Sequence, residues 1–162
     1  MLRSLAVVGA FVAVILLITL RQTPDQDRRV DPSPVVEAAA EVAPYPALVP
    51  PATPEGWRPT SARITPPGAD PFSWYVGYIT PEDRFVAVTQ SDDDRAVLLG
   101  EVGAAGDPDG TATVDGRTWE RLGSDDDARR ALVRDEDGVV TVVTGTAPYD
   151  VLEQLAASLQ ER

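Results

Sequence analysis

The chain contains no cysteine, no histidine and no lysine, so all 14 of its basic residues are arginine. The absence of cysteine excludes disulfide bonds, thiolate catalysis and lipid attachment to an N-terminal cysteine. The absence of histidine removes the usual general base near neutral pH and the commonest metal ligand. Asparagine is missing as well, and this coding bias indicates a GC-rich bacterial genome.

Positive charge is scarce, because 26 acidic residues against 14 arginines give a formal net charge of -12. Nucleic acids and anionic lipid headgroups are bound through basic patches, so this charge opposes both, and we expect no nucleic-acid partner. Three acidic clusters are present: Asp92 to Asp94, Asp125 to Asp127 and Asp135 to Asp137. The first has the form of a helix start at Ser91 and the last that of a hairpin turn. None has the ligand spacing of a calcium loop, so we expect no metal site and no cofactor.

One long apolar run is present, from Leu5 to Leu20. Its residues make about 24 Å of helix, and Arg3 can snorkel to the headgroups, so a span of the roughly 30 Å hydrocarbon core is feasible. The competing interpretation is a cleaved secretory signal, but no small-x-small cleavage site follows Leu20. We therefore expect residues 1–20 to be kept as a single-pass transmembrane anchor in contact with the lipid bilayer.

Arginines flank the apolar run on both sides. More of them follow the run than precede it, which opposes the extracytoplasmic orientation that we favour for the C-terminal domain. Arg21, Arg28 and Arg29 follow the run, whereas Arg3 precedes it. The positive-inside rule alone would thus leave the C-terminal part in the cytoplasm. However, nearby aspartates neutralise these arginines locally, and the short tail before the run is easily left in the cytoplasm. We expect an extracytoplasmic domain in the cell envelope.

Prolines are frequent between Arg21 and Pro54, which interrupts regular structure over most of that segment. We expect residues 21–55 to form a Pro-rich spacer, with a short helix within residues 35–43. If extended at about 3 Å per residue, the spacer would reach roughly 100 Å from the membrane, whereas a spacer docked on the domain would reach much less.

Residues 56–162 are sufficient for one domain with a sizeable core. Alternation of apolar and polar residues predicts strands, the first of them an edge strand, and turn residues between the strands predict hairpins. The clearest hairpin turn is at Asp115-Gly116, and this turn places Ala112 opposite Trp119. Hairpins rather than crossovers predict an α+β fold: a mainly antiparallel sheet with about two packed helices. The predicted strands are residues 57–65, 73–80, 84–90, 111–114, 117–122, 129–134 and 139–144, and the predicted helices begin near Ser91 and Pro148.

Two segments have a predicted place in the core. Residues 139–143 are apolar on both faces, which is typical of a central strand covered on both sides. The closing helix carries an apolar stripe that we expect to pack on the sheet, with Glu153 on the opposite, solvent side. The stripe consists of Val151, Leu152, Leu155, Ala156 and Leu159.

Several motifs are shared with a known family. Besides the N-terminal span and the helix after Gln90-Ser91, they are Ala43-Pro44-Tyr45-Pro46, Gly56-Trp57-Arg58-Pro59-Thr60, Trp74-Tyr75-Val76-Gly77-Tyr78 and Thr144-Gly145-Thr146. Through them the chain resembles, over nearly its whole length, the actinobacterial domain of unknown function forty-two forty-five. Members of that family look like single-span membrane proteins of unassigned activity. The resemblance therefore implies a membrane location and no mechanism.

No group of residues has a recognisable catalytic pattern, and we expect a protein that is not an enzyme. The first hypothesis is an anchored envelope module that binds another protein. The second is binding or sensing of a small apolar or glycan ligand, with Trp74, Tyr78 and Trp119 as candidate contacts, although aromatic residues at strand spacing are more often core. The third is a hydrolase with Glu120 and Asp150 as paired carboxylates, which requires burial that separates their pKa values.

Overall fold

The computed structural model describes residues 30–124 and 128–162. The predicted anchor at residues 5–20, the arginines that follow it and the acidic cluster at residues 125–127 lie outside these ranges. Within the described part of the chain, no helix combines the length and the apolar character needed to cross a membrane.

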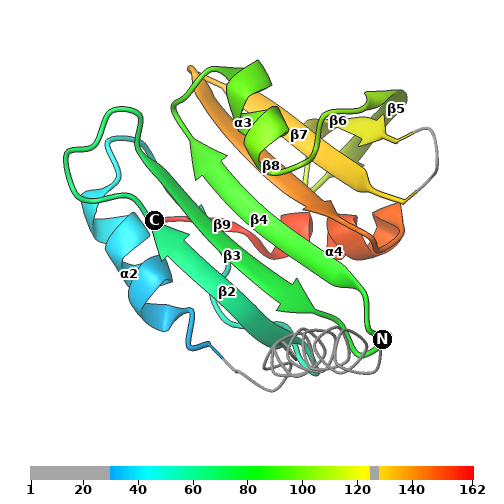
Figure 1. The fold of residues 1–162 in the computed structure, drawn as a ribbon, viewed down its shortest axis with the longest axis horizontal. Helices are drawn as coiled ribbons and strands as arrows, with labels where there is room; N and C mark the ends of the chain where they lie inside the picture. Colours follow the sequence, from blue (N-terminus) through cyan, green and yellow to red (C-terminus); the bar gives the residue numbers. More distant parts are fainter. Residues whose placement is uncertain (1–29, 125–127) are drawn as a thin grey trace, which may run out of the picture.

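Seven strands of the described residues form one antiparallel sheet (Figure 1). They are β2 (Arg58–Ile64), β3 (Ser73–Ile79), β4 (Phe85–Ser91), β5 (Asp107–Val114), β6 (Arg117–Gly123), β7 (Arg130–Glu136) and β8 (Val139–Gly145). Their order across the sheet is β2-β3-β4-β8-β7-β6-β5, and every neighbouring pair is antiparallel. The predicted α+β class with a mainly antiparallel sheet is confirmed.

The positions of individual strands follow from their side chains. Strand β8, which is apolar on both faces, occupies the middle of the sheet, and β2 lies at an edge, as predicted. The β5–β6 hairpin turns at Asp115 and Gly116, both with positive φ (49° and 73°), and pairs Ala112 with Trp119. Aspartate and glycine tolerate this backbone region, so the local turn sets the register of the hairpin.

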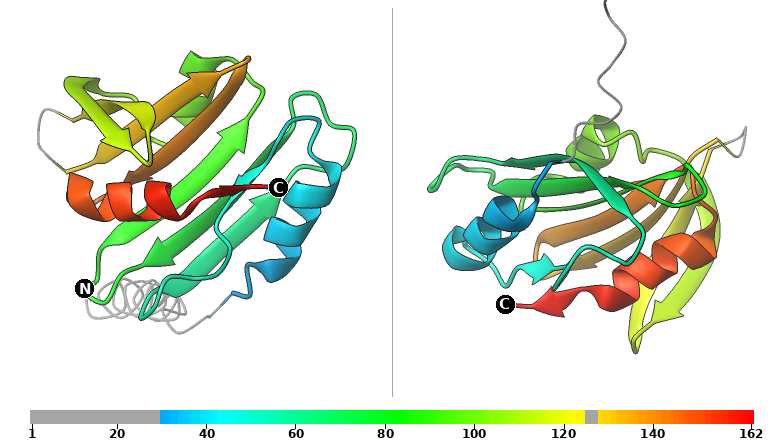
Figure 2. Two further views of the ribbon diagram at one scale, coloured as in Figure 1. Left: turned by 180° about the vertical axis from the view of Figure 1, so that it is seen from behind. Right: turned by 90° about the horizontal axis from the view of Figure 1, so that it is seen from below.

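Helices cover both faces of the sheet (Figure 2). Helix α2 (Ser33–Val42) and helix α4 (Tyr149–Ser158) lie on one side, here called the α4 face, and helix α3 (Arg95–Glu101) lies on the other, the α3 face. Two clusters of buried hydrophobic residues result, one between the sheet and α4 and a smaller one beneath α3. The described residues thus contain three packed helices, where the sequence predicted about two, because α2 also docks.

Helix α3 begins later than predicted. Its N-cap is Asp94 and not Ser91. The carboxylate of Asp94 accepts the N–H groups of Ala96 (2.8 Å) and Val97 (3.3 Å). Ser91 instead remains in β4, and its hydroxyl donates to the carbonyl of Phe72 at 3.0 Å. Aspartate and serine cap helices equally well, so strand pairing decides between them. Val97, in the first turn of this helix, is 48% exposed.

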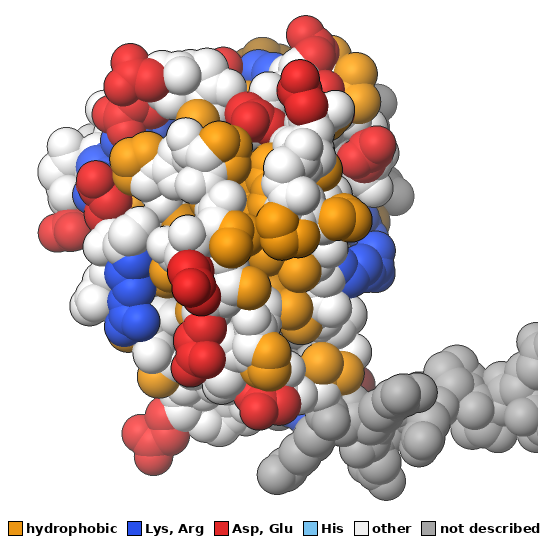
Figure 3. Space-filling model, turned by 90° about the vertical axis from the view of Figure 1, so that its left-hand side faces the viewer, with side chains coloured by type: hydrophobic (Ala, Val, Ile, Leu, Met, Phe, Trp, Pro, Cys, Tyr) orange, Lys and Arg blue, Asp and Glu red, His pale blue; other side chains and the backbone are white. Residues whose placement is uncertain are grey.

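Residues 30–55 are part of the folded domain, which corrects the predicted spacer and the predicted boundary at residue 56. Helix α2 packs on β2 and β3 and buries Val36 and Ala39. Strand β1 (Leu48–Val49) pairs with β9 (Gln160–Glu161) in a separate two-stranded sheet. On this side of the molecule hydrophobic side chains gather in the middle of the surface, with charged ones around them (Figure 3). The prolines keep the elements short but do not keep the segment off the domain.

The side chain of Gln90 joins this segment to the sheet. It is 3% exposed, and its Oε1 accepts the backbone N–H of Leu48 at 3.0 Å and the indole N–H of Trp74 at 3.2 Å. Its Nε2 donates to the carbonyl of Pro46 at 3.3 Å. A buried amide is stable only when its hydrogen bonds are made, so this contact fixes where residues 46–48 lie.

Replacement of Gln90 tests this role. Gln90→Leu keeps the volume but leaves two buried donors without an acceptor, so we expect a loss of about 3 kcal/mol of unfolding free energy in urea melts. The matched control Gln154→Leu, at an exposed position of α4, is expected to change stability by less than about 0.5 kcal/mol. Equal effects of the two substitutions would contradict the assignment.

Candidate functional site

The three aromatic residues proposed as ligand contacts are core residues. Trp74 and Trp119 are 1% exposed and Tyr78 is 0% exposed, and all three belong to the core on the α4 face. Burial raises the pKa of Tyr78 to about 12. Their alternate spacing along the strands reflects packing in the core, which is the alternative explanation given in the sequence analysis. The structure places none of them on a surface that a ligand can reach.

The two carboxylates of the hydrolase hypothesis lie on opposite faces of the sheet. Glu120 forms an ion pair with Arg95 at the start of α3. Asp150 lies in the first turn of α4, where its carboxylate accepts the N–H of Val151 at 2.9 Å. Because the sheet separates them, they do not act on one substrate as an acid–base pair.

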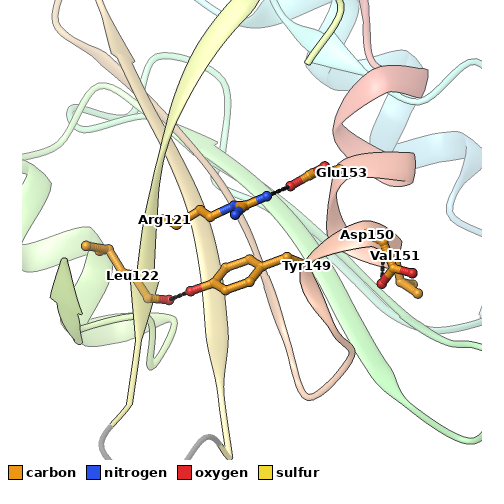
Figure 4. A network of polar contacts seen from close by, with 6 residues as sticks. All are labelled: Arg121, Leu122, Tyr149, Asp150, Val151 and Glu153. Carbon is orange, nitrogen blue, oxygen red and sulfur yellow. Dashed lines mark hydrogen bonds and ion pairs between the residues drawn. The ribbon is translucent and has the colours of Figure 1, made fainter. Parts of the chain in front are cut away.

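A polar cluster that the sequence did not predict joins α4 to β6 (Figure 4). The guanidinium of Arg121 contacts the carboxylate of Glu153 at 2.5 Å and lies 4.8 Å from the ring centroid of Tyr149. The hydroxyl of Tyr149 donates to the carbonyl of Leu122 at 3.0 Å. Glu153 is therefore partly buried against the sheet and not on the solvent side as expected. The cluster holds the helix in place against β6.

Removal of Glu153 should therefore destabilise the domain. In Glu153→Ala the guanidinium of Arg121, whose Nε is already buried without a partner among the described residues, loses its counterion. We expect a loss of about 1 to 2 kcal/mol, since the pair is only partly exposed, against less than about 0.5 kcal/mol for the neighbouring Gln154→Ala. Urea melts at low and high salt measure the difference, and no difference would mean that the ion pair contributes nothing.

The described acidic clusters support local backbone structure. Asp92 accepts the N–H of Phe72 at 2.7 Å, Asp94 caps α3, and Asp137 adopts a positive φ of 53° in the turn between β7 and β8. The predicted hairpin turn is therefore observed, whereas the predicted helix start is displaced from Ser91 to Asp94. Over residues 30–124 and 128–162, no three acidic side chains converge in a way that would hold a metal ion.

A cleft of about 500 Å³ opens on the α4 face, and we call it the Tyr45 cleft. Its wall is the ring of Tyr45, whose hydroxyl donates to the carbonyl oxygens of Phe72 at 3.2 Å and Gln90 at 3.1 Å. Burial, and secondarily the charge of Asp92, raises the pKa of Tyr45 above its usual value of 10. Other lining residues come from the neighbouring segments: Pro44, Pro46, Leu48, Gln90, Arg134, Glu136, Asp137, Val139, Thr141 and Glu161.

The charges of the Tyr45 cleft are mostly negative. Its one cation, Arg134, has a side chain only 12% exposed and is paired with Glu136. Asp137 and Glu161 are exposed at the rim. An aromatic wall, the apolar side chains of Leu48 and Val139 and an acidic rim fit a basic, partly apolar segment of another molecule better than an anion.

The Tyr45 cleft lies far along the strands from the point where the chain enters the domain. There the N–H of Val30 donates to the carbonyl of Pro59 at 3.2 Å, and Pro59 is paired with Tyr78 near the end of β3. The cleft residues Gln90 and Thr141 are paired with each other at the opposite ends of β4 and β8. Thus the entry point and the cleft are at opposite ends of the sheet.

The motif Ala43-Pro44-Tyr45-Pro46, which supported the family resemblance, supplies one wall of this cleft. A sequence model of the family described as “Protein of unknown function (DUF4245)” matches residues 1–159. The chain belongs to this family. No curated protein matches the chain. Membership in DUF4245 confirms the resemblance but assigns no activity, and the actinobacterial source stays a prediction.

Substitution of Tyr45 tests how the wall of the Tyr45 cleft in this DUF4245 protein is held. Tyr45→Phe removes the shared hydrogen bond to two carbonyl groups, so we expect a loss of about 1 to 2 kcal/mol at neutral pH. The half-exposed Tyr75 on the other face serves as control, and Tyr75→Phe should have little effect.

The same variant has an expected pH dependence. Because folding raises the pKa of Tyr45, the stability contributed by its protonated hydroxyl is complete below the unfolded value of 10 and is lost as the pH rises through the folded value. Unfolding free energy measured across this alkaline window should therefore fall less in Tyr45→Phe than in the unmodified chain. A parallel fall in both proteins would contradict the assignment.

Proposed function

We propose that this DUF4245 protein is a membrane-anchored, extracytoplasmic module of the cell envelope that binds another protein through the Tyr45 cleft. The observation that carries the proposal is the location of this cleft, which opens at the end of the sheet opposite the entry of the chain at Val30. The apolar run at residues 5–20, without a cleavage site behind it, supports the anchor. A site remote from the anchor is accessible to a partner in the envelope.

A protein partner suits the cleft better than a small molecule. Strand β9 forms one border and, within the described residues, pairs only with β1, so its other edge is free for main-chain pairing with an extended segment. The rim acids Glu136, Asp137 and Glu161 would select basic side chains in that segment. The small-ligand alternative rested on aromatic residues that are buried in the core, and no other observation favours it.

Site-specific photocrosslinking in intact cells tests the partner site. A photoreactive residue at Glu161, on the rim, is compared with one at Thr113, which is exposed on the edge strand β5. We expect one dominant protein adduct from position 161 that is weakened when Glu136 is changed to Arg, and none from position 113. Similar adducts from both positions would indicate collision and contradict the proposed site.

The anchor has its own test. Because no cleavage site follows the apolar run, the mature chain should retain residues 1–20 and stay in the membrane fraction through high-salt and carbonate washes. A protease added outside spheroplasts should cut between the anchor and Val30. A mature N-terminus near residue 40 would refute anchoring, and cleavage only after lysis would show that the arginine count after the run gives the correct topology.

A further inference from the structure

Half of the α3 face carries no helix among the described residues. Helix α3 covers the part of the sheet formed by β6, β7 and β8, whereas β2, β3 and β4 are open on that side (Figure 1). A groove of about 430 Å³ runs between α3 and these open strands. Its residues include Arg63, Tyr75, Phe85, Thr89, Leu98 and Arg129. We call the open surface of the three strands the β2–β4 face.

The β2–β4 face differs in charge from the rest of the molecule. None of the three strands contains an acidic residue, and β2 contributes Arg58 and Arg63. In a chain of net charge -12, this surface is therefore locally basic. The nearby acids lie outside the strands: Glu82 and Asp83 in the β3–β4 turn, and Glu101 on α3, where it lines the groove. The repulsion of headgroups inferred from net charge alone does not describe this side of the domain.

The side chains of this face combine aromatic rings with arginine guanidinium groups and form an amphipathic surface. The guanidinium of Arg63 lies 4.9 Å from the ring centroid of Tyr75. A Cβ at Gly77 would lie 2.9 Å from the hydroxyl of Tyr75 and 3.3 Å from the ring of Phe85, so both aromatic side chains lie across the glycine. Aromatic rings beside arginines are the composition that proteins place at the headgroup level of membranes.

The chain enters the domain at this same strand. Val30 is hydrogen-bonded to Pro59 of β2, so only residues 21–29 separate the proposed anchor from the sheet. Even fully extended, that length spans at most about 32 Å, not the roughly 100 Å of the longer spacer predicted from the sequence. Three of these nine residues are arginines and two are aspartates, so the segment keeps a net positive charge, which interacts favourably with lipid phosphates. With the proposed anchor in the bilayer, β2 is therefore held close to the headgroups.

We propose that the β2–β4 face rests on the headgroup region of the bilayer. This inference depends on the membrane anchor of the proposed function. Arg63 contacts lipid phosphates while Tyr75 and Phe85 lie at the level of the headgroups, and the residues between anchor and domain act as a short tether. In this orientation the Tyr45 cleft, which lies on the opposite face of the sheet, the α4 face, opens away from the membrane.

The absence of cysteine allows a direct test on the full-length chain. The chain is reconstituted into vesicles of phosphatidylcholine with phosphatidylglycerol, and a single fluorophore is attached at Ser61→Cys on the β2–β4 face. The matched control is Thr113→Cys on β5 at the other edge of the sheet. Lipids with a quencher in the headgroup should quench the label at position 61 several-fold more strongly than the label at position 113.

The charge reversal Arg63→Glu, at an exposed position, should reduce this difference while leaving the fold intact, as checked by the urea midpoint. Carbonate extraction of the same vesicles separates the two proposals. Equal quenching at both positions in carbonate-resistant protein overturns the docking but not the anchor, and is the result expected if a second copy of the chain covers the face. Extraction of the protein by carbonate refutes the anchor itself.

Discussion

The buried amide of Gln90 is the interaction on which the arrangement of this domain depends. It lies near the end of β4, where its three hydrogen bonds join β3, the segment after α2 and strand β1. Without it, residues 46–48 would have apolar contacts but no fixed register, since apolar packing has no direction. Because the amide requires specific donors and acceptors, it converts a proline-rich segment into part of the domain and forms one boundary of the Tyr45 cleft.

Docking of residues 30–55 also limits how far the domain can move from the proposed anchor. A free spacer would let the domain move far from the proposed anchor, whereas docking of residues 30–55 leaves only residues 21–29 between that anchor and β2. If the β2–β4 face lies on the headgroups as proposed, the α4 face of the sheet points away from the membrane. The proposed membrane-facing surface and the proposed partner cleft are consistent with each other because they lie on opposite faces of the sheet.

Charge is distributed by element and not evenly over the molecule. Acidic residues gather at turns and helix starts, where Asp92, Asp94 and Asp137 satisfy backbone N–H groups or adopt a positive φ. Strands β2 to β4 contain none. A single net charge therefore describes solubility but not the interactions of one face. Because these acidic side chains serve separate turns and helix starts, they do not combine into a metal site among the described residues.

Local patterns in the sequence determined much of the fold: the hairpin at Asp115-Gly116, the central place of β8 and the buried stripe of α4 each depend on neighbours only a few residues apart. The start of α3 was misplaced because two capping residues compete and only pairing of β4 with β8 decides between them. The docking of residues 30–55, the separation of Glu120 from Asp150 and the Tyr45 cleft were decided by the tertiary structure alone. Each depends on side chains far apart in the sequence, such as Tyr45 with Gln90 and Arg121 with Glu153, whose contacts no periodicity encodes.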